Sequence, residues 1–161
     1  MRPAHGGGKR RSKIRAVAVL GWLVLVLWGG EAPAVAQRSA EPQNLGAFAQ
    51  RIGLRDVEGF VDTVQSLRRT QRLPSRYVTK DAARARGWRG GGLCEVWPGQ
   101  VIGGDTMRNF GGKLPDMPGR VFREADLDGD CRSRGPRRLV FSNDGLIYVT
   151  LDHYNSFTPV P

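Results

Sequence analysis

The sequence predicts a domain of the α+β class, in which helices come first and an antiparallel β-meander follows. Apolar residues recur at helical spacing between residues 56 and 73. Beyond residue 105 the chain consists of short extended runs that are broken by turn residues. With 161 residues, the chain has the length of one domain with a tail.

The first 36 residues have the three parts of a secretory signal peptide. A basic segment ends at Arg15, an apolar run extends from Ala16 to Trp28, and Ala34-Val35-Ala36 forms a small-residue cleavage site. The alternative is an uncleaved anchor on a membrane-tethered protein, but the apolar run is shorter than the roughly 18–20 residues of a spanning helix. We therefore expect a secreted, extracellular protein without stable membrane association after cleavage.

The chain is basic, with 25 Lys and Arg residues against 15 Asp and Glu residues. Without the leader, 19 basic and 14 acidic residues remain, a net charge of +5. A positive surface favours a polyanionic partner such as a nucleic acid, although many solvated surfaces have the same composition.

Both cysteines, Cys94 and Cys131, lie in the part that is expected to be exported. A pair of cysteines in an oxidising compartment predicts a disulfide bond, and their spacing fits no zinc-binding pattern.

Residues 37–53 are predicted to be a flexible lead-in, because few of their apolar residues are in register. Asp56 then caps a helix that ends at Leu73-Pro74. Its apolar face is expected to lie in the core and consists of Val57, Phe60, Val61, Val64 and Leu67.

Thr79 is the predicted N-cap of a short second helix over Lys80–Arg86. Lys80 occupies its first position, where the helix dipole disfavours a cation, so Lys80 either has a role beyond helix stability or extends into solvent. Residues 87–104 are glycine-rich and predict a loop with at most one helical turn. Gly90-Gly91-Gly92 lacks the Lys-Ser/Thr ending of a nucleotide-binding loop.

Extended runs are expected at residues 109–112, 115–119, 120–125, 137–142 and 146–151. A two-residue loop at Asn143-Asp144 would place Arg134 opposite His153 and Arg138 opposite Val149. These two arginines and the histidine would then share one face, and a shift by two residues would preserve this arrangement. A bulge at Gly135-Pro136 would break it.

A carboxylate, an imidazole and several cations are therefore expected near one another. One of Glu124 and Asp126 is predicted on the cationic face, where nearby arginines keep a carboxylate ionised and able to accept a proton. His153, the single histidine after the leader, can donate a proton. With arginines to stabilise the transition state, such groups can cleave RNA without a metal or cofactor. The alternative is a strand with surface ion pairs and a partly buried histidine.

The run Asp126-Leu127-Asp128-Gly129-Asp130 begins like a calcium-binding loop. However, its glycine is the fourth residue instead of the sixth, and Arg137 stands where the bidentate glutamate belongs.

Several motifs together resemble the secreted bacterial ribonucleases of the barnase type, a group of the microbial guanyl-preferring ribonucleases. The resemblance covers most of the chain after the leader, and we assign the ribonuclease domain to residues 54–161. It is carried by Leu73–Lys80, Gly87-Trp88, Ile102–Asp105, Gly112–Pro115, Phe122–Asp126, Leu146–Tyr148, Asp152–Tyr154 and Phe157-Thr158.

The resemblance implies helices packed on a five-stranded antiparallel sheet, and an endoribonuclease that acts by transesterification. Glu124 would be the general base that deprotonates the ribose 2′-hydroxyl, and His153 the general acid that protonates the departing 5′-oxygen. Their roles would reverse when water opens the 2′,3′-cyclic phosphate.

The other site residues are assigned by the same resemblance. Arg134 and Arg138 would bind the phosphate, and Lys80 would be the active-site lysine. Asp105 would support this basic cluster, and Tyr154 would lie beside the base site.

The base-recognition loop departs from the family pattern. Family members have an Asn-Arg-Glu-Gly run whose glutamate binds guanine, whereas this chain has Asn109-Phe110-Gly111-Gly112, with Gly111 at the glutamate position. Backbone amides around Arg108–Phe110 can still bind the guanine oxygen, and Phe110 can stack. A guanine preference without that acceptor is expected to be relaxed.

The resemblance also implies a single-stranded RNA substrate and an acidic, barstar-like inhibitor protein as a partner, for which a basic cleft is well suited. The chain is expected to be a monomer. A non-catalytic RNA-binding module with the same fold is the alternative function, and it would bind RNA in a salt-sensitive manner without forming a product.

Overall fold

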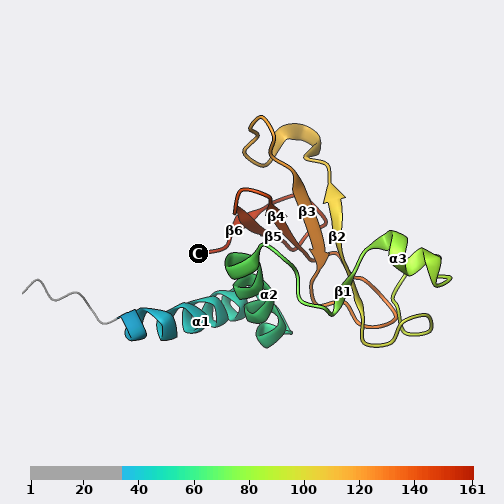
Figure 1. Ribbon diagram of the computed structural model, residues 1–161, viewed down its shortest axis with the longest axis horizontal. Helices are drawn as coiled ribbons and strands as arrows, with labels where there is room; N and C mark the ends of the chain where they lie inside the picture. The colour runs from blue at the N-terminus through green and yellow to red at the C-terminus, as the bar shows by residue number, and fades with distance from the viewer. Residues whose placement is uncertain (1–33) are drawn as a thin grey trace, which may run out of the picture. The chain divides into compact units, whose positions relative to one another are not determined.

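A computed structural model describes residues 34–161 of the chain, which contain three α-helices and six β-strands (Figure 1). The predicted signal peptide lies outside the described residues, except for its last three, which begin the first helix. Within residues 34–161, no helix combines the length and the apolar character needed to cross a membrane.

The second and third helices begin at the predicted caps. Helix α2 (Val57–Thr70) is capped by Asp56, whose carboxylate accepts a hydrogen bond of 2.9 Å from the Gly59 amide. Helix α3 (Lys80–Ala85) is capped by the Thr79 hydroxyl, which accepts a bond of 3.2 Å from the Ala82 amide. Helix α2 ends three residues earlier than predicted.

The expectation of a flexible lead-in over residues 37–53 is wrong, because helix α1 (Ala34–Arg51) occupies most of this range. Leu45, Phe48 and Ala49 are buried in the core, and the Phe48 ring stacks on Phe60 at 5.9 Å between centroids. The apolar positions of this helix are few, so its sequence pattern is weak. Packing against α2 and the sheet supplies the stability that the pattern does not indicate.

The α+β class is confirmed, but the sheet has six strands in the order β1-β2-β3-β4-β5-β6 instead of five. Strand β1 runs parallel to β2, and the remaining pairs are antiparallel. The strands are β1 (Tyr77–Val78), β2 (Val101–Met107), β3 (Phe122–Asp126), β4 (Arg138–Ser142), β5 (Ile147–Thr150) and β6 (Thr158–Pro159).

Three of these strands were not predicted from the sequence. Strands β1 and β6 have only two residues each, and β2 begins within the glycine-rich range that was expected to be a loop. Residues 109–112 were expected to be extended but contain the 3₁₀-helix η1 (Phe110–Gly112), and residues 115–119 form no strand. Glycine and very short segments give little strand signal, so pairing with neighbouring strands determines these elements.

The two faces of the sheet have different environments. Odd-numbered residues of β3, β4 and β5 pack against α1 and α2 in the main core, to which they contribute Ala125, Leu139, Phe141, Ile147 and Val149. On the opposite face lie the even-numbered residues, among them the buried polar side chains Glu124, Asp126, Arg138 and Thr150. Strand alternation thus directs polar groups away from the helices and gathers them on one surface.

The predicted hairpin register is wrong by one residue. Arg138 lies opposite Thr150 instead of Val149. The loop has three residues because Gly145 adopts a left-handed φ of 96°, and the Ser142 amide bonds to the Leu146 carbonyl at 2.9 Å. Even-numbered residues therefore share a face on both strands, and His153 lies beyond the end of β5.

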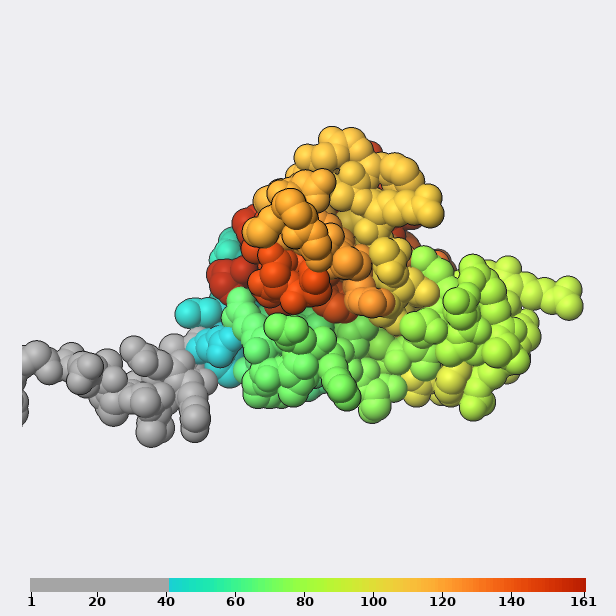
Figure 2. Space-filling model, turned by 45° about the horizontal axis from the view of Figure 1, so that its top comes forward, coloured from blue at the N-terminus to red at the C-terminus, as the bar shows by residue number. Residues whose placement is uncertain are grey.

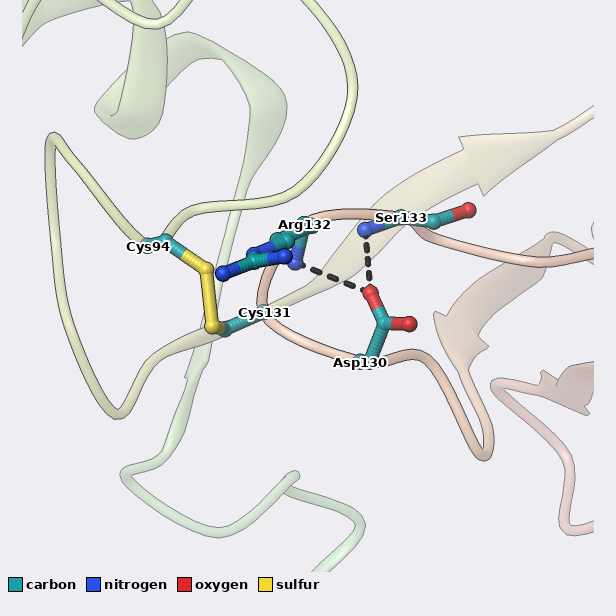
Figure 3. Close-up of a disulfide and its surroundings, with 5 residues drawn as sticks. All are labelled: Cys94, Asp130, Cys131, Arg132 and Ser133. Atoms are coloured by element: carbon teal, nitrogen blue, oxygen red, sulfur yellow. Dashed lines mark hydrogen bonds between the residues drawn. A yellow bond between two sulfur atoms is a disulfide. The ribbon is translucent and has the colours of Figure 1, made fainter.

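The predicted disulfide bond between Cys94 and Cys131 is confirmed (Figure 3). It joins the loop after α3 to the loop between β3 and β4. Two backbone hydrogen bonds accompany it, from Gly92 to Arg132 at 2.9 Å and from Cys94 to Cys131 at 2.8 Å. A Cβ atom at Gly92 would lie 2.0 Å from the Cys131 carbonyl oxygen, so this close approach requires glycine.

Replacing both Cys94 and Cys131 by alanine is expected to lower the free energy of unfolding by about 3–4 kcal/mol, because the bond closes a long loop in the unfolded chain. The residues are separated by 37 positions. Urea denaturation of the variant and the oxidised protein measures the difference, with the reduced unaltered protein as the control. Equal stability of all three would contradict a structural role for the bond.

Candidate active site

The Glu124 carboxylate lies at the centre of the polar face, and its side chain is 7% exposed. Its Oε1 atom accepts a hydrogen bond of 2.6 Å from the Lys80 ammonium group, and its Oε2 atom accepts one from the Tyr154 hydroxyl. The structure thus brings together three of the predicted site residues, which come from β3, α3 and the loop after β5.

Two opposing effects determine the pKa of Glu124. Burial raises the pKa of the carboxyl group, but the hydrogen bonds from Lys80 and Tyr154, together with the charges of Lys80 and Arg138, outweigh burial and hold the pKa below its ordinary value. Glu124 is therefore ionised at neutral pH. Each carboxylate oxygen still has a lone pair with which it can accept a proton.

Tyr154 is half-buried beside Glu124 and remains a hydrogen-bond donor over the physiological range. Burial, with the hydrogen bond to the Glu124 carboxylate and its negative charge, raises the pKa of the phenol to about 12. Tyr154 also lines a cavity together with Arg108, Asn109 and Phe110.

Asp105 holds the start of α3 in place. Its carboxylate accepts hydrogen bonds of 3.0 and 3.2 Å from the Lys80 backbone amide, and Asp105 pairs with Glu124 across strands β2 and β3. An anion at the N-terminus of a helix offsets the unfavourable cation at its first position. The unusual placement of Lys80 is thereby explained, because its side chain is directed to Glu124 and not into solvent.

A second buried carboxylate, Asp126, holds the two arginines that were predicted to bind phosphate. Arg134 donates to both of its oxygens, at 2.7 and 2.9 Å, and the Nε atom of Arg138 lies 2.9 Å from Oδ1 without the alignment of a hydrogen bond. Arg134 retains 22% of its side-chain exposure, whereas Arg138 retains 4%. Arg134 is therefore the more accessible of the two to a bound anion.

The expectation that only one of Glu124 and Asp126 faces the cations is wrong. The two residues are two positions apart in one strand, so both side chains lie on the same face.

The calcium-loop alternative also fails, because its carboxylates bind separate partners: Asp126 binds the arginines, Asp128 binds Arg137, and Asp130 caps its own loop. Among the described residues, no cluster of three metal-binding side chains occurs.

His153 is exposed in the loop that follows β5, and its ring centroid lies 4.9 Å from that of Tyr154. Both residues have left-handed backbone angles, with φ of 55° and 69°. Asp152 stabilises this conformation, since its carboxylate accepts hydrogen bonds from Asn155, Ser156 and the Thr150 hydroxyl. The Thr150 hydroxyl in turn accepts a bond of 2.9 Å from the Tyr154 amide.

Sequence reasoning missed the supporting functions of Asp126, Thr150 and Asp152. Thr150 on β5 pairs with Arg138 on β4, and Arg138 pairs with Asp126 on β3. Asp126, Arg138 and Thr150 therefore lie in one row across the sheet. This row connects the arginines to the His153 loop. The correct hairpin register would have revealed it.

A cavity of about 450 Å³ lies beside Glu124 and Tyr154. The predicted base-binding residues Arg108, Asn109 and Phe110 line it, and Gly111 lies in the same turn, with a left-handed φ of 79°. Phe110 is 77% exposed, while the Asn109 side chain bonds to the Leu114 backbone at both its oxygen and its nitrogen. Asn109 therefore holds the loop closed, and Phe110 is available to a ligand.

Comparisons with known proteins agree with this arrangement. A family model described as ribonuclease matches residues 61–161. The chain is 45% identical over 106 residues to ribonucleases of Bacillus intermedius and Bacillus pumilus, and 44% identical over 106 residues to a ribonuclease of Heyndrickxia coagulans. Each alignment covers 65% of this chain. It spans 65% of the two Bacillus proteins, just under two thirds, and 97% of the Heyndrickxia protein.

The match extends from within α2 to the last residue and includes every site residue described above. The chain therefore belongs to the ribonuclease family and is similar to its barnase-type microbial members.

Proposed function

We propose that the protein is a secreted endoribonuclease that cleaves single-stranded RNA by transesterification and requires no metal ion. The observation that carries this proposal is the buried, ionised Glu124, bonded to Lys80 and Tyr154 and adjacent to the arginines on Asp126. Burial alone disfavours a charged carboxylate, but the neighbouring donors and cations offset this cost and keep Glu124 ionised. A buried charge with specific charged partners beside a cavity is typical of functional sites.

In the first step, Glu124 accepts the proton of the ribose 2′-hydroxyl. The 2′-oxygen attacks the phosphorus atom, the bond from phosphorus to the 5′-oxygen breaks, and the His153 imidazolium donates its proton to that oxygen. In the second step, His153 takes a proton from water while the water oxygen attacks the phosphorus atom of the cyclic phosphate. The bond from phosphorus to the 2′-oxygen breaks, and protonated Glu124 returns its proton to that oxygen. The product is a 3′-phosphate, and both residues regain their initial protonation states.

The cations stabilise the additional negative charge of the pentacoordinate transition state. Lys80 and Arg134 are the partly exposed cations of the cluster, with side-chain exposures of 26% and 22%. Their positions are fixed before substrate binds, by Glu124 and Asp126 respectively. Such fixed charges lower the barrier without reorganisation during the reaction.

The cavity between Glu124 and the Asn109–Lys113 loop is the proposed base site. Its exposed Phe110 ring can stack on any base, whereas Gly111 offers no side-chain acceptor to guanine. We therefore propose a guanine preference that is weaker than the preference that an acidic side chain at position 111 would give.

A secreted protein of this activity endangers its producer, so an acidic inhibitor that covers the basic cleft is the proposed partner.

Glu124→Gln and His153→Ala are each expected to lower kcat/KM for RNA cleavage by a factor of about 10²–10⁴, since each removes one proton-transfer group. Cleavage of a fluorogenic oligoribonucleotide measures the effect. Glu58→Gln, an exposed carboxylate on α2, is the matched control and is expected to retain activity. Salt-sensitive RNA binding without a product in the unaltered protein would support the non-catalytic alternative instead.

Lys80→Ala is expected to move the acidic limb of the kcat/KM profile to higher pH. The acidic limb reports protonation of Glu124, and removing Lys80 removes the largest effect that lowers the pKa of this carboxyl group. Tyr154→Phe is expected to move the limb in the same direction. Unchanged limbs in both variants would show that another group titrates there.

Gly111→Glu is expected to increase the preference for guanosine on the 5′ side of the cleaved bond, because it supplies an acceptor to the guanine edge. Dinucleoside phosphates that differ only in that base measure the preference, and Gly111→Gln is the uncharged control. Because Gly111 has a left-handed φ, stability is measured alongside. An unaltered base preference in a folded variant would place base recognition elsewhere.

A further inference from the structure

The disulfide joins two loops (Figure 3). These loops border a groove of about 850 Å³. One wall is formed by residues 87–96 after α3, and the other by Cys131 and Arg132 after β3. We propose that this groove binds the RNA strand on the 3′ side of the cleaved phosphodiester. This inference rests on the proposed ribonuclease activity and adds a binding site to it.

The groove adjoins the arginines of the active site. The Arg134 guanidinium carbon lies 5.9 Å from the centre of the Trp88 ring, and Trp88 lines the groove. A smaller cavity of about 230 Å³ is lined by Arg134 and Asp126 and shares Gly92 and Cys131 with the groove. A strand whose phosphate contacts Arg134 can therefore continue into the groove.

The base cavity and the groove lie at opposite ends of β3. Met107, which comes shortly before the Asn109–Lys113 loop, pairs with Phe122 at the start of this strand, whereas Cys131 lies in the loop beyond its last residue, Asp126. In Figure 2 the gold segment around residue 110 and the light-green segment around residue 85 form separate projections. If the nucleotide 5′ of the cleaved bond occupies the base cavity, the 3′ portion has to leave towards the groove.

The charges of the groove suit a phosphate backbone. Arg89 and Arg132 are exposed, and in the described part of the chain no carboxylate lies within salt-bridge distance of either. Glu95 is the single carboxylate among the residues that line the groove. By contrast, the nearby Arg84 is paired with Asp81 at 2.8 Å. Unpaired arginines can bind successive phosphates of a nucleic acid, because binding releases the counterions that are condensed on the phosphates.

The groove walls are fixed before any ligand binds. The disulfide and the backbone bond from Gly92 to Arg132 hold the two loops together. The Asp130 carboxylate accepts bonds from the Arg132 and Ser133 amides, at 2.9 and 2.5 Å, which orders the turn that leads to Arg134 (Figure 3). A pre-organised surface loses little conformational entropy when a strand binds.

The test uses the full protein and an Arg89→Ala/Arg132→Ala double variant with three substrates. These are a dinucleoside phosphate, the same dinucleotide extended by three nucleotides at its 3′ end, and the same dinucleotide extended at its 5′ end. The expected result is a loss of about tenfold in kcat/KM for the 3′-extended substrate, with less than about twofold for the other two. Arg69→Ala, an exposed arginine on α2, is the matched control.

Binding of a 2′-deoxy oligonucleotide, which lacks the attacking hydroxyl, provides a readout that does not depend on catalysis. For a single strand, the loss of two phosphate contacts is expected to reduce the slope of log affinity against log salt by about 1.4. Equal losses on all substrates, a loss confined to the 5′-extended substrate, or unchanged slopes would each overturn the proposal. Failure of the unaltered protein to cleave any of the three substrates would refute the ribonuclease activity, while the deoxy-oligonucleotide titration would still test the groove.

Discussion

The hydrogen-bonded ion pair between Lys80 and Glu124 is the interaction on which the site depends. It joins a helix terminus to a central strand over 44 residues of sequence, and its nitrogen and oxygen lie 2.6 Å apart. Both partners need support from elsewhere: Asp105 holds the Lys80 backbone, and Tyr154 donates to the second Glu124 oxygen. Because the pair keeps Glu124 charged despite its burial, it couples the position of α3 to the chemistry of the strand.

Asp126 organises the other half of the site in the same manner. Its carboxylate holds both Arg134 and Arg138 and offsets only part of their positive charge. The loops on either side contribute different elements, since the Asn109–Lys113 loop borders the proposed base cavity and the disulfide-linked loop carries Arg134. The Lys113 ammonium group bonds to the Tyr154 and Asn155 carbonyls, so the base loop is also tied to the His153 loop.

Much of this site could be predicted from sequence, because local rules and family motifs identify single residues. The caps Asp56 and Thr79, the misplaced cation Lys80 and the cysteine pair each had a local signal that the structure supports. The hairpin register had no such local signal. One left-handed glycine, Gly145, changes the length of the loop and thereby changes which residues of β5 share a face with those of β4. Helix α1 and the short outer strands depend on tertiary packing, which the local sequence pattern does not contain.

If Glu124 and His153 transfer protons in a transesterification, the first product of RNA cleavage has to be a cyclic phosphate. Mass spectrometry of a single-turnover digest in chelator is expected to detect a 2′,3′-cyclic phosphate that appears first and is then converted to the 3′-phosphate. A 5′-phosphate product, a 3′-phosphate that forms without the cyclic intermediate, or no cleavage in chelator would rule out this metal-independent transesterification.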